Sequence, residues 1–165
     1  MKHPARLADS EYVGPRVYFL TICAHKRRPL FIDAPVADLV MSHFLSTALE
    51  RNVAILAYCL MPDHLHAVAR MKAADGNFLE FVRVAKQRTA FAFRRRYAAP
   101  LWQPSFFDRT LRDTSHWPSV LAYVVANPIR AGLVSRVDDY VFWGSSTYSR
   151  LELLEFVARE SRGRT

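Results

Sequence analysis

The chain has 165 residues, of which 51% are hydrophobic and 23% are charged, and its net charge is +8. This length and balance are typical of a globular protein with one hydrophobic core, and we expect residues 1–165 to form a single domain. No stretch approaches the ~18 consecutive apolar residues of a membrane span, so we expect no membrane partner. The first residues lack the apolar run of a secretory signal, which predicts a cytoplasmic protein.

The charge is unbalanced, with 23 Lys and Arg against 15 Asp and Glu. Such an excess predicts a polyanionic partner, nucleic acid first. A solubilising surface would give the same total, so composition alone leaves both explanations open. Cys23 and Cys59 each lie in an apolar run. They are predicted to be reduced and buried, not part of a disulfide framework or a cysteine metal site.

The first half of the chain predicts a strand, a helix and two further strands. A loose lead-in over residues 1–14 precedes residues 17–23, which are apolar on both faces as in a central strand. Asp33 and Pro35 are a helix-start signal, and apolar residues at helical spacing continue to about residue 51. Two strands are then predicted over 53–61 and 64–71, joined by a Pro-Asp turn.

A second helix is predicted over 78–97 and a fourth strand over 106–112. The order strand, helix, strand, strand, helix, strand predicts an α+β fold, the ferredoxin-like βαββαβ arrangement, with an antiparallel sheet and both helices on one face. A third helix over 115–126, with Ser115 as N-cap, is predicted to cover the other face. Residues 142–146 are expected to form a loop, and residues 150–165 a peripheral tail with a short helix at 151–159.

His64 and His66 lie in the third predicted strand. Side chains alternate between the faces of a strand, so both histidines share one face while Leu65 and Ala67 occupy the apolar opposite face. A structural or merely exposed pair would follow the same pattern. The alternative is a pair of metal ligands, because neutral imidazole is the commonest side-chain ligand of catalytic transition metals.

Basic side chains gather on the second helix and in the loop after the first strand. Either this is a solvated face, as charge runs usually are, or part of it contacts a nucleic-acid backbone. Because a nucleic-acid partner is already expected, we predict DNA contacts for these residues. They are Arg27 and Arg28 in the loop, and Arg83, Lys86, Arg94, Arg95 and Arg96 on the helix.

Tyr123 and Asn127 are four residues apart at the end of the third predicted helix, so they face the same way. Tyr123 is either an amphipathic helix residue or a nucleophile. A phenol with a free pKa of ~10 reacts poorly at neutral pH, but a nearby cation can polarise a phosphodiester and allow a covalent intermediate. Asn127 is either a metal ligand or the N-cap of the turn that begins with Pro128.

Several motifs together resemble those of the REP-associated tyrosine transposases, a branch of the single-tyrosine HUH transposases. Residues 62–66 (Pro-Asp-His-Leu-His) resemble the His-hydrophobic-His motif of that family. The resemblance extends over roughly residues 15–150. Its other motifs are 17–21 and 27–31 in the first strand and loop, 101–103, 106–109 and 111–113 around the fourth strand, and 123–134, which begins with Tyr123 and contains Asn127-Pro128.

This resemblance implies cleavage and joining of single-stranded DNA near hairpins, through a 5′-phosphotyrosine and a Mg²⁺ or Mn²⁺ ion. It makes Tyr123 the nucleophile and His64 and His66 metal ligands. Asn127 would be the third ligand, where the insertion-sequence relatives usually have Gln. The REP-associated branch also implies a monomer, not a dimer that exchanges the catalytic helix.

Two other functions fit the same residues. The first is a non-catalytic module that binds nucleic acid on its open sheet face, which exposed aromatics on that face would favour. The second is a metal-dependent nuclease that forms no covalent intermediate with DNA.

Overall fold

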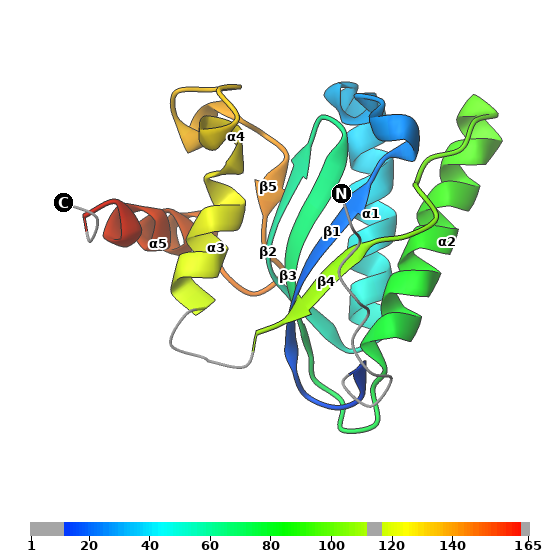
Figure 1. Ribbon diagram of the computed structural model, residues 1–165, viewed down its shortest axis with the longest axis horizontal. Coiled ribbons are helices and arrows are strands. Elements are labelled where there is room, and N and C mark those ends of the chain that lie inside the picture. Colours follow the sequence, from blue (N-terminus) through cyan, green and yellow to red (C-terminus); the bar gives the residue numbers. More distant parts are fainter. Residues whose placement is uncertain (1–11, 112–116, 163–165) are drawn as a thin grey trace.

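The computed structural model describes residues 12–111 and 117–162. It contains a five-stranded antiparallel sheet in the order β4-β1-β3-β2-β5 (Figure 1). The strands are β1 (Val17–Cys23), β2 (Val53–Met61), β3 (His64–Met71), β4 (Phe107–Thr110) and β5 (Trp143–Gly144). Without β5, the order and pairing are those of the ferredoxin-like arrangement, which confirms the fold predicted from the sequence.

Helices α1 (Ala34–Glu50) and α2 (Phe78–Tyr97) cover one face of the sheet (Figure 1). Helix α2 begins after Asn77, whose side-chain oxygen accepts a hydrogen bond from the Glu80 backbone N–H at 3.0 Å. Its buried stripe meets that of α1, with the Phe44 and Phe81 rings 5.6 Å apart. The apolar face of β3, including Leu65 and Ala67, belongs to the same core.

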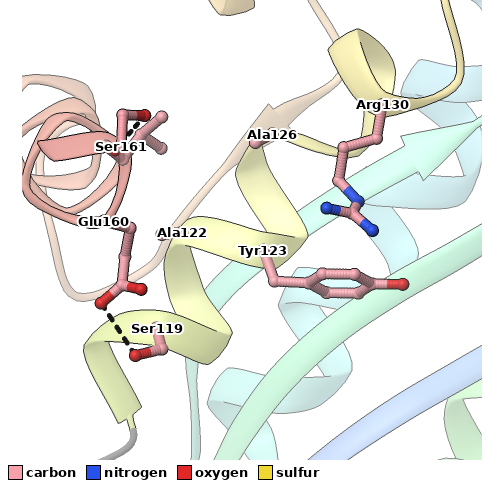
Figure 2. A pocket seen from close by; sticks show the side chains of 8 residues that line it. Ser119, Ala122, Tyr123, Ala126, Arg130, Glu160 and Ser161 are labelled. Atoms are coloured by element: carbon pink, nitrogen blue, oxygen red, sulfur yellow. Dashed lines mark hydrogen bonds between the residues drawn. The ribbon is translucent and has the colours of Figure 1, made fainter. Parts of the chain in front are cut away.

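The opposite face is covered by α3 (Trp117–Val125) and, behind it, α5 (Arg150–Arg162) (Figure 1). Leu121, Val124 and Val125 of α3 pack with β2 residues in a second core, which explains why β2 is buried on both faces. Ser119 of α3 donates a hydrogen bond to Glu160 of α5 at 2.8 Å (Figure 2). The third helix predicted from the sequence therefore lies where it was expected.

The ends of the predicted elements shift, and two terminal segments are packed more closely than expected. The fourth strand, expected over 106–112, spans Phe107–Thr110, and the predicted N-cap Ser115 lies outside the described residues. Tyr12, at the end of the expected lead-in, is buried and its ring lies 6.3 Å from that of Tyr18. Helix α5 is longer than the predicted tail helix and buries Leu153 in the second core.

A fifth strand replaces the loop expected at residues 142–146, where the sequence-based expectation was wrong. Trp143 pairs with Cys59 and Gly144 with Tyr58, so β5 extends the sheet beyond β2. The Gly144 backbone approaches the Tyr58 ring so closely that an added Cβ would lie 3.0 Å from its hydroxyl oxygen. A two-residue strand shows no alternation, and only its partner strand defines it.

Two further short helices complete the chain. These are α4 (Asn127–Arg130), which follows α3 after a single turn residue, and the 3₁₀ turn η5 (Val137–Asp139). Two other 3₁₀ turns, η2 (His25–Arg27) and η3 (Leu30–Ile32), connect β1 to α1. Across residues 12–111 and 117–162, no helix has both the length and the hydropathy needed to cross a bilayer.

We expect Leu153→Ala to lower the free energy of unfolding by about 2–5 kcal/mol, because it leaves a cavity between α5, α3 and the sheet. Leu151→Ala, on the same helix at a position that is 69% exposed, is the matched control and should change stability by less than ~0.5 kcal/mol. Urea denaturation of both variants checks this. Equal, small effects would show that α5 contributes little to the fold.

Candidate active site

The side chains of His64 and His66 meet on the sheet face that α3 covers. Both project from the same face of β3, and their Nε2 atoms are 3.0 Å apart. The rings are nearly perpendicular, with centroids 4.5 Å apart. Adjacent ligands of an octahedral ion at a bond length of ~2.1 Å are themselves about 3.0 Å apart. The spacing of the two nitrogens therefore fits a shared divalent ion.

The other ring nitrogen of each histidine has its own hydrogen-bond partner. Nδ1 of His64 lies 2.6 Å from Oδ1 of Asp63, and Nδ1 of His66 lies 2.8 Å from Oγ1 of Thr21. When both Nδ1 atoms donate, both Nε2 atoms carry lone pairs, and two lone pairs at this distance repel each other unless a cation lies between them. Partners of this kind typically orient metal-binding histidines.

The environment keeps His66 uncharged. Burial, together with the nearby His64 and Arg27 and against the opposing effect of Asp63, lowers the pKa of His66 to about 3. An imidazole with this pKa is neutral near pH 7, so its nitrogen is available to a metal without first losing a proton.

Arg27 reaches the same site from the loop after β1. Its Nε lies 2.9 Å from Oδ2 of Asp63, so that carboxylate joins Arg27 to His64. Lys26 and Arg27 both adopt left-handed backbone conformations, with φ of 54° and 56°. Such conformations are unfavourable for residues with a Cβ and occur preferentially at functional sites. Arg27, predicted to contact DNA, thus binds the carboxylate that contacts His64.

Tyr123 lies on α3 above this pair and is 41% exposed. Its ring centroid is 6.3 Å from that of His66 and 6.2 Å from that of Phe19. The guanidinium carbon of Arg130 lies over the ring, 5.0 Å from its centroid, and the hydroxyl points away from α5 (Figure 2). The structure therefore brings an accessible phenol beside the imidazole of His66.

Asn127 is the first residue of α4 and is 8% exposed. The residue at the N-cap position is Ala126, so the N-cap role considered for Asn127 is not the one it has. Instead its side-chain Nδ2 donates to the Tyr123 carbonyl at 2.9 Å. This hydrogen bond fixes the Asn127 amide to the helix that carries Tyr123. The amide oxygen Oδ1, the atom that would bind a metal, takes no part in this hydrogen bond.

Within the described parts of the chain, no group of three His, Cys, Asp or Glu residues is arranged to hold a metal. A divalent ion at His64 and His66 would therefore complete its coordination with an amide oxygen, water or substrate oxygens. With these ligands such an ion would keep positions open for a phosphodiester, as catalytic sites require.

The predicted DNA-binding residues of α2 lie on the other layer of the molecule, across the sheet from the histidines (Figure 1). Arg83 pairs with Glu80 at 2.8 Å. Lys86 donates to three backbone carbonyls of residues 103–105, at 2.8 to 3.1 Å. Arg28 in the loop and Arg94, Arg95 and Arg96 at the end of α2 are exposed. DNA contacts by these residues stay a prediction.

The sequence did not single out Thr21 or Phe107 as residues near the histidine pair. Register places both in one row with His66, since Thr21 pairs with His66 on one side and with Phe107 on the other. A polar Thr inside an otherwise apolar strand was the available signal for Thr21. Nothing in the order of residues along the chain indicates the row itself, because three different strands form it.

Comparison with known proteins gives consistent matches. A curated relative, the REP-associated tyrosine transposase of Escherichia coli (strain K12), is 24% identical over 139 residues, covering 84% of this chain and 80% of the relative. A solved structure of a REP-associated tyrosine transposase bound to a REP hairpin has the same fold, with a TM-score of 0.71 and 22% identity over 87% of this chain and 82% of that one. These matches confirm the resemblance that the motifs indicated.

The family profile described as "Transposase IS200 like" matches residues 16–127. This range runs from β1 to the start of α4 and includes the histidine pair, Tyr123 and Asn127. Because the match spans more than half of the sequence, the chain belongs to the IS200-like transposase family.

Proposed function

We propose that this protein cleaves and rejoins single-stranded DNA next to hairpins, through a covalent bond between Tyr123 and a DNA 5′ phosphate. The observation that carries the proposal is the pair of Nε2 atoms at 3.0 Å beside an exposed tyrosine. The relative whose structure holds a REP hairpin supports hairpin DNA as the substrate class. The net charge of +8 supports a polyanionic substrate.

His64 and His66, with Asn127 as third ligand, would hold a Mg²⁺ or Mn²⁺ ion. When bound there, the ion supplies charge that polarises a phosphodiester and makes its phosphorus more electrophilic. Thr21 and Asp63 orient the imidazoles through their Nδ1 atoms, so that little rotation is needed when substrate binds.

The Tyr123 oxygen attacks the phosphorus, and the bond from phosphorus to the 3′ oxygen of the preceding nucleotide breaks. The phenol proton passes to water, and the released oxygen takes a proton from water. The products are a free 3′ hydroxyl and a 5′-phosphotyrosine. A DNA 3′ hydroxyl can later attack the same phosphorus, which restores the phenol and joins two strands without ATP.

The proposal includes a monomer, because α3 has an extensive apolar packing surface on its own sheet. Helix α3 packs on the sheet of its own chain through Leu121, Val124 and Val125, and α5 packs behind it. Tyr123 is thereby held beside His66 of the same chain. An exchanged α3 would have to leave this second core, at the cost of its buried apolar surface.

We expect Tyr123→Phe to abolish formation of a protein–DNA adduct with labelled hairpin DNA and Mn²⁺, resolved on a denaturing gel. The variant loses one oxygen, so stability should change little. Tyr97→Phe is the matched control, since Tyr97 ends α2 on the far side of the sheet, and it should form the adduct as wild type does.

Three results would contradict this proposal. An adduct from Tyr123→Phe would identify another nucleophile. Specific cleavage by wild type without any adduct would favour a nuclease with no covalent step, and hairpin binding without cleavage would favour a non-catalytic binding module. A chelator should abolish the wild-type adduct.

We expect Thr21→Val to weaken Mn²⁺ binding by roughly 10- to 100-fold, because His66 loses the partner that orients it while the side-chain volume is kept. Calorimetric titration with Mn²⁺ measures the affinity. Thr147→Val, at an exposed position after β5, is the control. Equal affinity in both variants would show that the hydroxyl does not orient the imidazole.

A mixture of the Tyr123→Phe and His66→Ala variant proteins should form no protein–DNA adduct, because each variant lacks one essential side chain of the site. If subunits exchanged α3, one site of each mixed dimer would combine an intact Tyr123 with an intact His66. Adduct formation after the two variants are mixed, tested over a range of protein concentrations, would therefore contradict the proposal that the protein acts as a monomer.

A further inference from the structure

A groove lies on the other side of Tyr123 from α5. Its walls are Phe19, Phe107 and Arg109 of the sheet and Ser119, Val120 and Tyr123 of α3, and we call it the Phe107 groove. Its volume of about 310 Å³ is at the small end for ligand sites, ~300–1,000 Å³. The groove is therefore suited to a single planar group rather than to a duplex.

Strand register aligns this groove with the histidine pair. Phe107, Thr21 and His66 form one cross-strand row, and Arg109, Phe19 and Val68 form the next. Side chains of such rows share a sheet face, and neighbouring strands are ~4.8 Å apart, which places Phe107 roughly 10 Å from His66. A nucleotide in the groove would thus lie beside a phosphodiester held at the histidines.

The groove presents aromatic surface that packing inside the chain leaves uncovered. Phe107 is 39% exposed and Tyr123 is 41% exposed. The ring of Phe19 lies edge-on between them, 6.4 Å from the Phe107 centroid and 6.2 Å from the Tyr123 centroid. Exposed aromatic rings on a sheet are the usual platform on which single-stranded bases stack.

Positive charge accompanies the rings. Arg109 follows Phe107 by two residues on the same face of β4, and it is exposed. It forms no ion pair with another described residue. An arginine next to an exposed ring is the combination that binds the phosphate and the base of one nucleotide.

We propose that the Phe107 groove binds the unpaired nucleotide next to the cleaved phosphodiester, with its base stacked on Phe107 and its phosphate at Arg109. This inference rests on the proposed function for the position of the cleaved bond. It assigns substrate positioning to β4, whereas the basic residues predicted to contact DNA lie in the loop after β1 and on α2.

The test measures binding without cleavage, in Tyr123→Phe protein. The probe is a DNA hairpin with a single-stranded tail that carries a fluorescent adenine analogue at one tail position at a time. Stacking should quench the fluorescence at one tail position. Adding Phe107→Leu, which keeps an apolar side chain, should remove that quenching and weaken binding about tenfold. Phe107→Trp should instead retain the quenching and the affinity.

Phe91→Leu is the matched control, because Phe91 is 65% exposed on α2 across the sheet, and quenching and affinity should not change. Arg109→Gln is an independent variant at an exposed position. It should reduce the slope of log K against log salt concentration by roughly 0.7, the value for one phosphate contact on a single strand.

The outcomes separate this inference from the proposed function. Unchanged quenching and affinity in Phe107→Leu, or an unchanged salt slope in Arg109→Gln, would overturn the groove assignment and leave the adduct result intact. A wild-type protein that never forms an adduct would overturn the proposed chemistry, while loss of quenching in Phe107→Leu would still support a base-stacking site.

Discussion

Two imidazole nitrogens held 3.0 Å apart are the constraint around which this molecule is arranged. Such an arrangement needs a rigid strand, because the two rings must be held in place whether a proton or a cation lies between the two nitrogens. Strand β3 supplies the rigidity, since it pairs with β1 along one edge and with β2 along the other. Thr21 on β1 and Asp63 before β3 then fix the rings from behind.

The same strand separates two cores with different tasks. Its apolar face, with Leu65 and Ala67, packs under α1 and α2 and stabilises the sheet. Its other face carries the histidines, and the second core beside them holds α3 in place through Leu121, Val124 and Val125. Burial of α3 against β2 therefore positions Tyr123 without any bond from Tyr123 itself to the strand. Helix α5 strengthens this arrangement from the outer side.

Charge and aromatic surface are divided between the two layers. The cluster of arginines at the end of α2 lies on the layer away from the histidines, where it can add long-range attraction for DNA. Close to Tyr123 the surface is instead a mixture of single cations and rings, with Arg130 over Tyr123 on one side and Arg109 with Phe107 on the other. Such a surface suits an unpaired strand more than a duplex.

The sequence by itself determined the order of the first four strands and of α1, α2 and α3, and it placed His64 and His66 on one face of their strand. Alternation along residues 64–71 and helical spacing along 34–50 and 78–97 are local patterns, so alternation alone assigns His64 and His66 to one face of their strand. The family resemblance of residues 123–134 likewise depends on residues that are close in sequence.

Only the tertiary structure decided what lies beside these residues. Thr21, Phe107 and His66 form one row because three strands pair in a particular register, and β5 exists only because β2 offers an edge to Trp143 and Gly144. Lys86, expected on a DNA-facing surface, donates to the 103–105 carbonyls because the chain returns past α2 there. Contacts of this kind join distant segments, and local patterns carry no information about them.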